Sequence, residues 1–374
     1  MNNFSIDDLL EKYKNNQCNE QELAQLENWY LQWKPDYALV SAKEITDAQQ
    51  EVWAAVSAEV TPSAKVTIYR KIGIAAAIGV ILLSAAIWFT TFKTGSSALP
   101  SYANDVSPGG NGATLTLANG RKIKLNNVKP GALRMDAGIK IVKVADGKLI
   151  YEVNQDVKVP GEINTLSTGN GETYQLIMSD GTAVWLNAGS SISFAANLKE
   201  GGKRRLELSG EAYFEVARDK KHPFVVKTTG QEVEVLGTHF NINAYPEEED
   251  SRTTLLEGSV DVKAFGKHQV LTPGTEALNT GKSVEVYPAD AQLAVAWKNN
   301  KFVFNNENIK SIMKEVARWY NVKVHYRGEV PTDSFEGSVS RFDRISKVLG
   351  ILESTGQVHF EVNGRDIYVS KSTN

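Results

Sequence analysis

The chain has 374 residues, of which 42% are hydrophobic and 23% are charged, and its formal net charge at pH 7 is −3. This composition is typical of ordinary globular domains and argues against extended disorder. Because Cys18 is the single cysteine, the composition also excludes stabilisation by a disulfide within the chain.

The first part of the chain predicts a small all-α domain over residues 1–64. Apolar side chains recur there at helical spacing in three stretches, and Asn19 with Glu22 forms a capping-box pattern at the start of the second. These residues carry eleven acidic and four basic side chains, a net charge of −7. An acidic surface of this kind suits a basic partner. On charge alone, an acidic surface that serves only solubility is an equally good interpretation.

An unbroken apolar run predicts a transmembrane helix over residues 72–92, after a linker at 65–71. The run has 21 residues without a charge, and a helix needs about 20 to cross the hydrocarbon core. A helix buried in a soluble core is the alternative, but such a helix is rarely apolar on every side. Three basic residues closely precede the run and only Lys93 closely follows it. We therefore expect a single-pass membrane protein with a cytoplasmic N-terminus and an exported C-terminus.

Residues 113–297 predict an all-β domain, which follows a polar spacer at 93–112. Glycine-containing turn dipeptides recur through this region between stretches of alternating apolar and polar residues. Two hairpin sequences, TLTLANGRKIKLN and QLIMSDGTAVWLN, are near copies 61 residues apart. This similarity favours an internal duplication over coincidence. A β-sandwich and an irregular β-solenoid both fit the pattern.

Residues 298–374 predict a C-terminal α+β module. Apolar residues from Ile309 to Tyr320 follow a helical period, and a second helix is expected between Phe342 and Leu352. Short strands flank each helix, so the expected module consists of two βαβ units. The fold class expected for the chain is a multidomain membrane protein with an all-α head, one transmembrane helix, an all-β domain and an α+β module.

The sequence shows no arrangement typical of a common enzyme or cofactor site. The five histidines lack the short spacings of a metal site, and there is no nucleophile elbow, phosphate loop or dinucleotide fingerprint. We therefore expect no enzyme activity on a substrate, no metal and no cofactor. Basic clusters such as residues 199–205 are short, so direct binding of nucleic acid is not expected.

One dipeptide, Gly237-Thr238, has a possible chemistry of its own. A threonine hydroxyl held against the preceding carbonyl can accept the acyl group from its own nitrogen, and the resulting ester hydrolyses easily. Self-cleavage between the two residues is one interpretation of this pair. A tight turn without any reaction is the other.

Five sequence stretches between Leu166 and Ala277 form an ordered set: DGTAVWLNAGSSISF, RRLELSGEAYFEVARDKKHPFVVKT, VEVLGTHFNINAY, LLEGSVDV and LTPGTEA. Together they resemble the periplasmic domain of the FecR family of transmembrane anti-sigma factors. The motif residues, for which we expect a structural role, are Asp180, Gly181, Trp185, Leu186, Asn187, Gly189, Ser190, Gly210, Glu211, Phe214, Pro223 and Phe224.

Two further regions resemble the same family. The stretch LLEKYKNNQCNEQELAQLENWYLQW is similar to its cytoplasmic anti-sigma helices. The C-terminal region looks like the family's C-terminal module, which is similar to the short N-terminal domain of secretins and TonB-linked receptors. With the apolar run, the resemblance covers nearly the whole chain.

The resemblance implies a signal relay across the cell envelope, by a chain that crosses the inner membrane once and has a periplasmic C-terminus. The head would bind an extracytoplasmic-function sigma factor, with Leu23, Leu26, Trp29 and Trp33 as candidate contacts. The C-terminal module would contact the signalling domain of a TonB-dependent outer-membrane transporter. Regulated proteolysis, including a cut by an intramembrane protease, would release the sigma factor, and some members cleave themselves at the matching Gly-Thr pair. A membrane-anchored periplasmic binding or envelope-assembly protein without a transcriptional role is the alternative.

Overall fold

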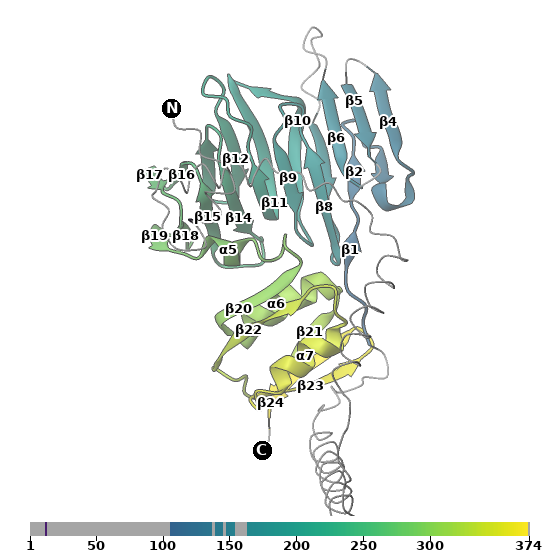
Figure 1. Cartoon of the computed structure of the whole chain (residues 1–374), viewed down its shortest axis with the longest axis vertical. Coiled ribbons are helices and arrows are strands. Elements are labelled where there is room, and N and C mark those ends of the chain that lie inside the picture. The colour runs from purple at the N-terminus through teal and green to yellow at the C-terminus, as the bar shows by residue number, and fades with distance from the viewer. Residues whose placement is uncertain (1–11, 13–104, 137–138, 145–146, 154–162, 373–374) are drawn as a thin grey trace, which may run out of the picture. The chain divides into compact units, whose positions relative to one another are not determined.

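The computed structural model describes residue 12 and residues 105–372, apart from 137–138, 145–146 and 154–162 (Figure 1). In these residues there are 24 strands and three α-helices, so the fold shown is mostly β. The helices have 4, 12 and 9 residues, and none is long and apolar enough to cross a membrane. The expected fold class, with its all-α head and transmembrane helix, is therefore wrong for the molecule that the structure shows. The head at 1–64, the linker at 65–71 and the run at 72–92 lie outside the described residues, Lys12 excepted.

Residues 110–288 form two β-sheets that share one strand. The first sheet has the order β3 (Lys122–Lys124), β2 (Thr114–Thr116), β7 (Ile163–Ser167), β10 (Ser191–Glu200), β11 (Lys203–Glu215), β12 (Phe224–Thr228), β13 (Gln231–Val235), β16 (Val260–Ala264) and β17 (Lys267–Leu271). The second has the order β4 (Gly131–Asp136), β5 (Ile139–Lys143), β6 (Leu149–Val153), β8 (Glu172–Ile177), β9 (Ala183–Leu186), β11, β14 (His239–Ala244), β15 (Ser251–Glu257), β18 (Thr275–Asn279) and β19 (Val284–Pro288).

A single apolar core joins the two sheets, as in a β-sandwich. Alternate residues of β13 and β16 are buried, as expected for strands with one face toward a core. Along the chain, hairpins alternate between the sheets: β12–β13 lies in the first, β14–β15 in the second, β16–β17 in the first and β18–β19 in the second. Every second hairpin therefore extends the same sheet, which explains why the sequence fitted a solenoid as well as a sandwich.

Strand β11 passes from one sheet to the other at Gly210. Its residues up to Ser209 pair with β10, and from Gly210 onward they pair with β14. Gly210 has φ +95°, and a Cβ at this position would lie 2.5 Å from the Ser190 Oγ. Only glycine combines this conformation with so close an approach. The shared strand thus depends on one residue without a side chain.

The two similar hairpin sequences make the same turn. In β2–β3, Gly120 N donates to Leu117 O, and in β8–β9, Gly181 N donates to Met178 O. The glycines have φ +81° and +86°. In each turn the residue before the glycine, Asn119 or Asp180, accepts a hydrogen bond through its side-chain oxygen from the backbone N–H two residues later. The repeat is therefore a repeat of local turn chemistry, although the hairpins belong to different sheets.

The C-terminal module contains both helices expected there. After α5 (Ala291–Ala294), its elements are β20 (Lys301–Asn308), α6 (Ile309–Tyr320), β21 (Lys323–Arg327), β22 (Ser334–Ser340), α7 (Ile345–Glu353), β23 (Val358–Asn363) and β24 (Asp366–Lys371). Helix α6 begins where the Asn308 side chain accepts from Ser311 N, and it ends at Asn321, which is left-handed.

The expected pair of βαβ units is wrong. Strand β20 pairs antiparallel with β22, whereas β21 pairs parallel with β24, which also pairs antiparallel with β23. The strands on either side of α6 therefore belong to different sheets. Periodicity indicates where a strand lies along the chain but not which strand it joins.

Part of the predicted spacer is ordered against the rest of the molecule. Within residues 105–112, strand β1 (Gly110–Asn111) pairs parallel with β8. Val106 is 8% exposed and belongs to the apolar core of the C-terminal module.

Candidate functional site

The motif residues lie on consecutive parts of the sandwich. Asp180 and Gly181 form the β8–β9 turn, Trp185 and Leu186 lie on β9, Asn187, Gly189 and Ser190 follow it, Gly210, Glu211 and Phe214 lie on β11, and Pro223 and Phe224 lead into β12. The polar members divide into two networks, one centred on Glu211 and one on Arg204. Leu186, Phe214 and Phe224 are fully buried, and the Phe214 ring stacks on Phe240 at 5.0 Å.

Glu211 is a buried carboxylate held by two amide side chains. It is 8% exposed, and its Oε2 accepts from Asn187 Nδ2 at 2.7 Å while its Oε1 accepts from Asn241 Nδ2 at 3.0 Å. Its backbone N–H donates to Ser190 Oγ at 2.9 Å. Burial raises the pKa of the Glu211 carboxyl, and the hydrogen bonds from Asn241 and Asn187 oppose that change.

Arg341 of the C-terminal module reaches this network. Its Nη2 donates to Asn187 Oδ1 at 3.0 Å and its Nη1 to Trp297 O at 3.0 Å, and the guanidinium lies 3.9 Å from the centre of the Trp319 ring. Arg341 is 3% exposed, and burial lowers its pKa to about 10 against the attraction of Glu315 and Glu211. Asn187 therefore connects a buried carboxylate of the sandwich with a buried cation of the module.

A second arginine strengthens the same junction. Arg318 on α6 donates through Nη1 to Glu248 Oε1 at 2.7 Å, and its guanidinium lies 3.8 Å from the centre of the Tyr245 ring. The Arg318 carbonyl accepts from Gly171 N at 2.7 Å, and Tyr245 OH donates to Ala188 O at 2.8 Å. The junction thus combines ion pairing, stacking and backbone hydrogen bonds.

A polar cavity of about 810 Å³ opens at this junction. Six of the residues that line it are Asn187, Glu211, Asn241, Glu307, Glu315 and Arg341. Although Glu315 is an exposed residue, loss of hydration beside the cavity and the charges of Glu307 and Glu211 raise the pKa of its carboxyl. Among the described residues, no group of three or more histidine, cysteine, aspartate or glutamate side chains is arranged to hold a metal ion.

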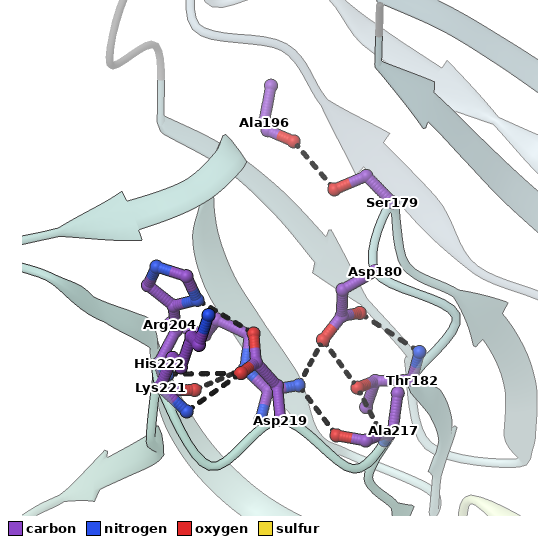
Figure 2. A network of polar contacts seen from close by, with 9 residues as sticks. All are labelled: Ser179, Asp180, Thr182, Ala196, Arg204, Ala217, Asp219, Lys221 and His222. Atoms are coloured by element: carbon purple, nitrogen blue, oxygen red, sulfur yellow. Dashed lines mark hydrogen bonds and ion pairs between the residues drawn. The ribbon is translucent and has the colours of Figure 1, made fainter. Parts of the chain in front are cut away.

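The Arg204 network fixes the motif turn to β11 (Figure 2). The Arg204 side chain is 4% exposed, and its Nη1 donates to Asp180 Oδ2 at 2.7 Å and to Ala217 O at 2.8 Å. Thr182 donates its backbone N–H to Asp180 Oδ1 and its hydroxyl to Oδ2. Arg204 Nε donates to His222 O, and the Arg204 backbone N–H donates to Pro223 O, both at 2.8 Å. The buried cation therefore joins three segments of the motif.

Figure 2 also shows a more exposed pair beside Arg204. Asp219 accepts from the backbone N–H of Lys221 and lies 2.7 Å from His222 Nδ1. The hydrogen bonds with His222 and Lys221 lower the pKa of Asp219 to about 2. Because both side chains are exposed, this pair adds little to stability.

The Gly237-Thr238 pair lies directly before β14. Gly237 has φ +149°, and a Cβ there would lie 2.7 Å from Arg218 Cα, so glycine is required. Thr238 is 3% exposed, and its hydroxyl donates to Ser259 O at 3.0 Å. A Cβ on Gly258 would lie 2.9 Å from the Thr238 hydroxyl oxygen and 3.1 Å from Gly237 O. The peptide is therefore tightly enclosed and lies beside a surface cavity of about 700 Å³.

The motif residues selected from the sequence did not include the two central arginines, Arg204 and Arg341. Arg341 is 154 residues from Asn187, and no local pattern relates them. Arg204 carried a usable signal, because it has the inward register of Leu206 and Leu208 on β11, where a charge needs a partner. The candidate sigma-binding residues Leu23, Leu26, Trp29 and Trp33 lie outside the described residues.

Comparison with protein families places both modules in one group. The family model described as FecR protein matches residues 164–261, and the one described as FecR, C-terminal matches residues 301–369. Each of the two matched segments is therefore similar to a part of the FecR family. The FecR match contains Asp180, Arg204 and Glu211, and the C-terminal match contains Arg318 and Arg341. The junction thus joins the two segments that the family models match.

Solved structures show the same similarity. Two crystal structures of a candidate anti-sigma factor from Parabacteroides distasonis, one at 1.65 Å and one at 2.50 Å, are 28% identical to this chain with a TM-score of 0.53. Each comparison covers 56% of this chain, and 99% and 100% of the other. No curated protein matches the chain.

Removal of the Asp180 carboxylate is expected to destabilise the FecR domain strongly. In Asp180→Ala, the buried Arg204 cation loses its countercharge, which typically costs about 3–5 kcal/mol of unfolding free energy. The matched control is Glu207→Ala, which breaks the exposed pair with Lys227 and should cost about 1 kcal/mol or less. Urea denaturation of the full chain measures both, and similar losses for the two variants would contradict this role of Arg204.

Loss of the Arg341 side chain is expected to loosen the junction. In Arg341→Leu, Asn187 Oδ1 and Trp297 O lose a donor and Glu211 loses a nearby cation, so we expect a cost of about 3 kcal/mol or more. Hydrogen exchange should rise at residues 187–190 of the sandwich as well as within α7. Arg327→Leu, which removes an arginine 53% exposed on the same module, is the control. Native exchange at residues 187–190 in Arg341→Leu would refute the coupling.

Self-cleavage at Gly237-Thr238 would depend on the Thr238 hydroxyl. The native chain and Thr238→Ser are then expected to yield a fragment that begins at position 238, whereas Thr238→Ala remains a single chain. Mass spectrometry of the purified protein distinguishes these products. If the native chain stays intact, the prediction of self-cleavage is wrong. If Thr238→Ala is also cleaved, the cut is made by a protease and not by the Thr238 hydroxyl.

Proposed function

We propose that this FecR-family chain is an anti-sigma factor that binds an extracytoplasmic-function sigma factor and releases it in response to a signal outside the cytoplasm. The observation that supports this proposal most is that one chain matches both the FecR model and, after it, the FecR C-terminal model. The similarity to the candidate anti-sigma factor from Parabacteroides distasonis supports the same role, because it covers nearly all of that protein.

Residues 1–64 carry the sigma-binding activity in this proposal. Sigma factors bind promoter DNA and present basic surfaces to it, so a segment with a net charge of −7 is suited to compete for those surfaces. Leu23, Leu26, Trp29 and Trp33 are the proposed contacts, since large aromatic side chains dominate protein interfaces.

Residues 113–374 carry the sensing activity in this proposal. Their location is the periplasm, with residues 1–64 in the cytoplasm, and the partner of the C-terminal module is the signalling domain of a TonB-dependent outer-membrane transporter. Regulated proteolysis, including an intramembrane protease, completes the release of the sigma factor. The junction between sandwich and module, to which Arg341 and Arg318 contribute hydrogen bonds, is suited to this task. A partner that displaces the module would take Arg341 away from Asn187, which donates to Glu211.

A fragment of residues 1–65 is expected to co-purify with the sigma factor encoded near this gene. The double variant Trp29→Ala, Trp33→Ala should lose that complex through removal of two interface aromatics, and Trp53→Ala is the control for loss of a tryptophan elsewhere in the fragment. Absence of a complex with the native fragment would contradict the proposal.

RNA sequencing of a deletion strain provides the cellular measurement. Loss of an anti-sigma factor should change transcription of one transporter operon. An unchanged transcriptome would instead favour a periplasmic binding or assembly protein. A phosphatase reporter fused after residue 374 tests the location independently, because it is active only in the periplasm.

A further inference from the structure

Residues 105–112, hereafter the strap, bind the start of helix α7 in the C-terminal module. The Asp105 carboxylate accepts from Ser346 N at 3.1 Å and from Ser346 Oγ at 2.8 Å. Arg344 Nη1 donates to Asp105 O at 3.2 Å, and Ile345 N donates to Val106 O at 3.1 Å. Four hydrogen bonds thus connect two strap residues with the first turn of α7.

This contact supplies a cap that α7 lacks locally. The residue at its N-cap position is Arg344, whose side chain accepts no hydrogen bond from the helix. The first N–H groups of a helix need hydrogen-bond acceptors, and a carboxylate at this end also interacts favourably with the positive end of the helix dipole. Asp105 meets both needs from 241 residues away. The stability of α7 is therefore linked to the position of the strap.

The other end of the strap is fixed to the sandwich. Gly110 N donates to Gly171 O at 2.8 Å and Gly112 N to Thr173 O at 3.1 Å, which extends the second sheet by strand β1. A Cβ on Gly109 would lie 2.5 Å from Gly171 O and 2.9 Å from Trp319 Cε3. The backbone at Gly109 thus passes between the sandwich and α6 where no side chain fits.

We propose that the strap is a coupling device: it docks on both modules and transmits displacement of the C-terminal module to the chain that precedes residue 105. A partner that engages the start of α7 competes with Asp105 and Val106 and frees the strap. By linkage, a change that withdraws the strap weakens α7 to the same extent. As a step of signal release, this inference rests on the proposed anti-sigma function, but the coupling itself does not.

The coupling is tested by hydrogen exchange of the full chain, with one variant on each side of the contact. Asp105→Ala changes the strap and Ser346→Ala changes the helix, and each removes the hydrogen bond between their side chains. We expect Asp105→Ala to raise exchange at the start of α7 by about fivefold, the effect of a lost helix cap, and Ser346→Ala to raise exchange in residues 105–112. Glu361→Ala, which breaks an exposed pair on the same module, is the control and should change neither segment.

The coupling would be overturned if exchange stayed at the native rate at the start of α7 in Asp105→Ala, or in residues 105–112 in Ser346→Ala. An equal change in Glu361→Ala would overturn it as well. A transcriptional reporter then tests the relay in cells. With Asp105→Ala, partial loss of repression is expected without the inducing signal. If deletion of the whole gene alters the reporter but Asp105→Ala does not, the strap is not a relay. If the deletion alters nothing, the anti-sigma function fails while the exchange result still decides the coupling.

Discussion

One amide side chain, that of Asn187, connects two buried ionisable residues, Glu211 and Arg341, where the sandwich meets the C-terminal module. Its Nδ2 donates to Glu211 and its Oδ1 accepts from Arg341. An amide has both a donor and an acceptor, whereas an aspartate would place a second carboxylate against Glu211 and a leucine would satisfy neither charge. The FecR domain and the C-terminal module are therefore joined by hydrogen-bond geometry as much as by apolar packing.

Local elements of this fold were predictable because their causes are local. The apolar period that predicted a helix from Ile309 is present as α6, and the Asp180-Gly181 turn has the positive φ that its glycine suggested. Pairing across the chain was not predictable in the same way. Nothing near β21 indicates that it joins β24 rather than β20, because that choice is made by packing between distant segments. The same reason applies to the polar, glycine-rich spacer, which is packed over residues 105–112. Its contacts there are made by backbone groups, the Val106 side chain and the Asp105 carboxylate.

The candidate site, too, was predictable where its causes are local and not where they depend on distant segments. Motif resemblance selected Asn187, Ser190, Gly210 and Glu211, which the structure brings together. Arg341, which donates to Asn187, carries no pattern in the sequence. Arg204 lay inside a motif stretch and could have been found, because a charge in the inward register of a strand requires a countercharge. The similarity of fold and family thus identified the sandwich side of the junction, while the geometry identified the side that the module supplies.

The passage of β11 through both sheets has a mechanical consequence. In most sandwiches the two layers are separate hydrogen-bonded networks that contact only through side chains. Here a covalent backbone runs from one network into the other at Gly210, so neither layer can shear past its neighbour or detach without disrupting ladder bonds in both. A load applied at one edge therefore passes into both layers through the backbone of β11.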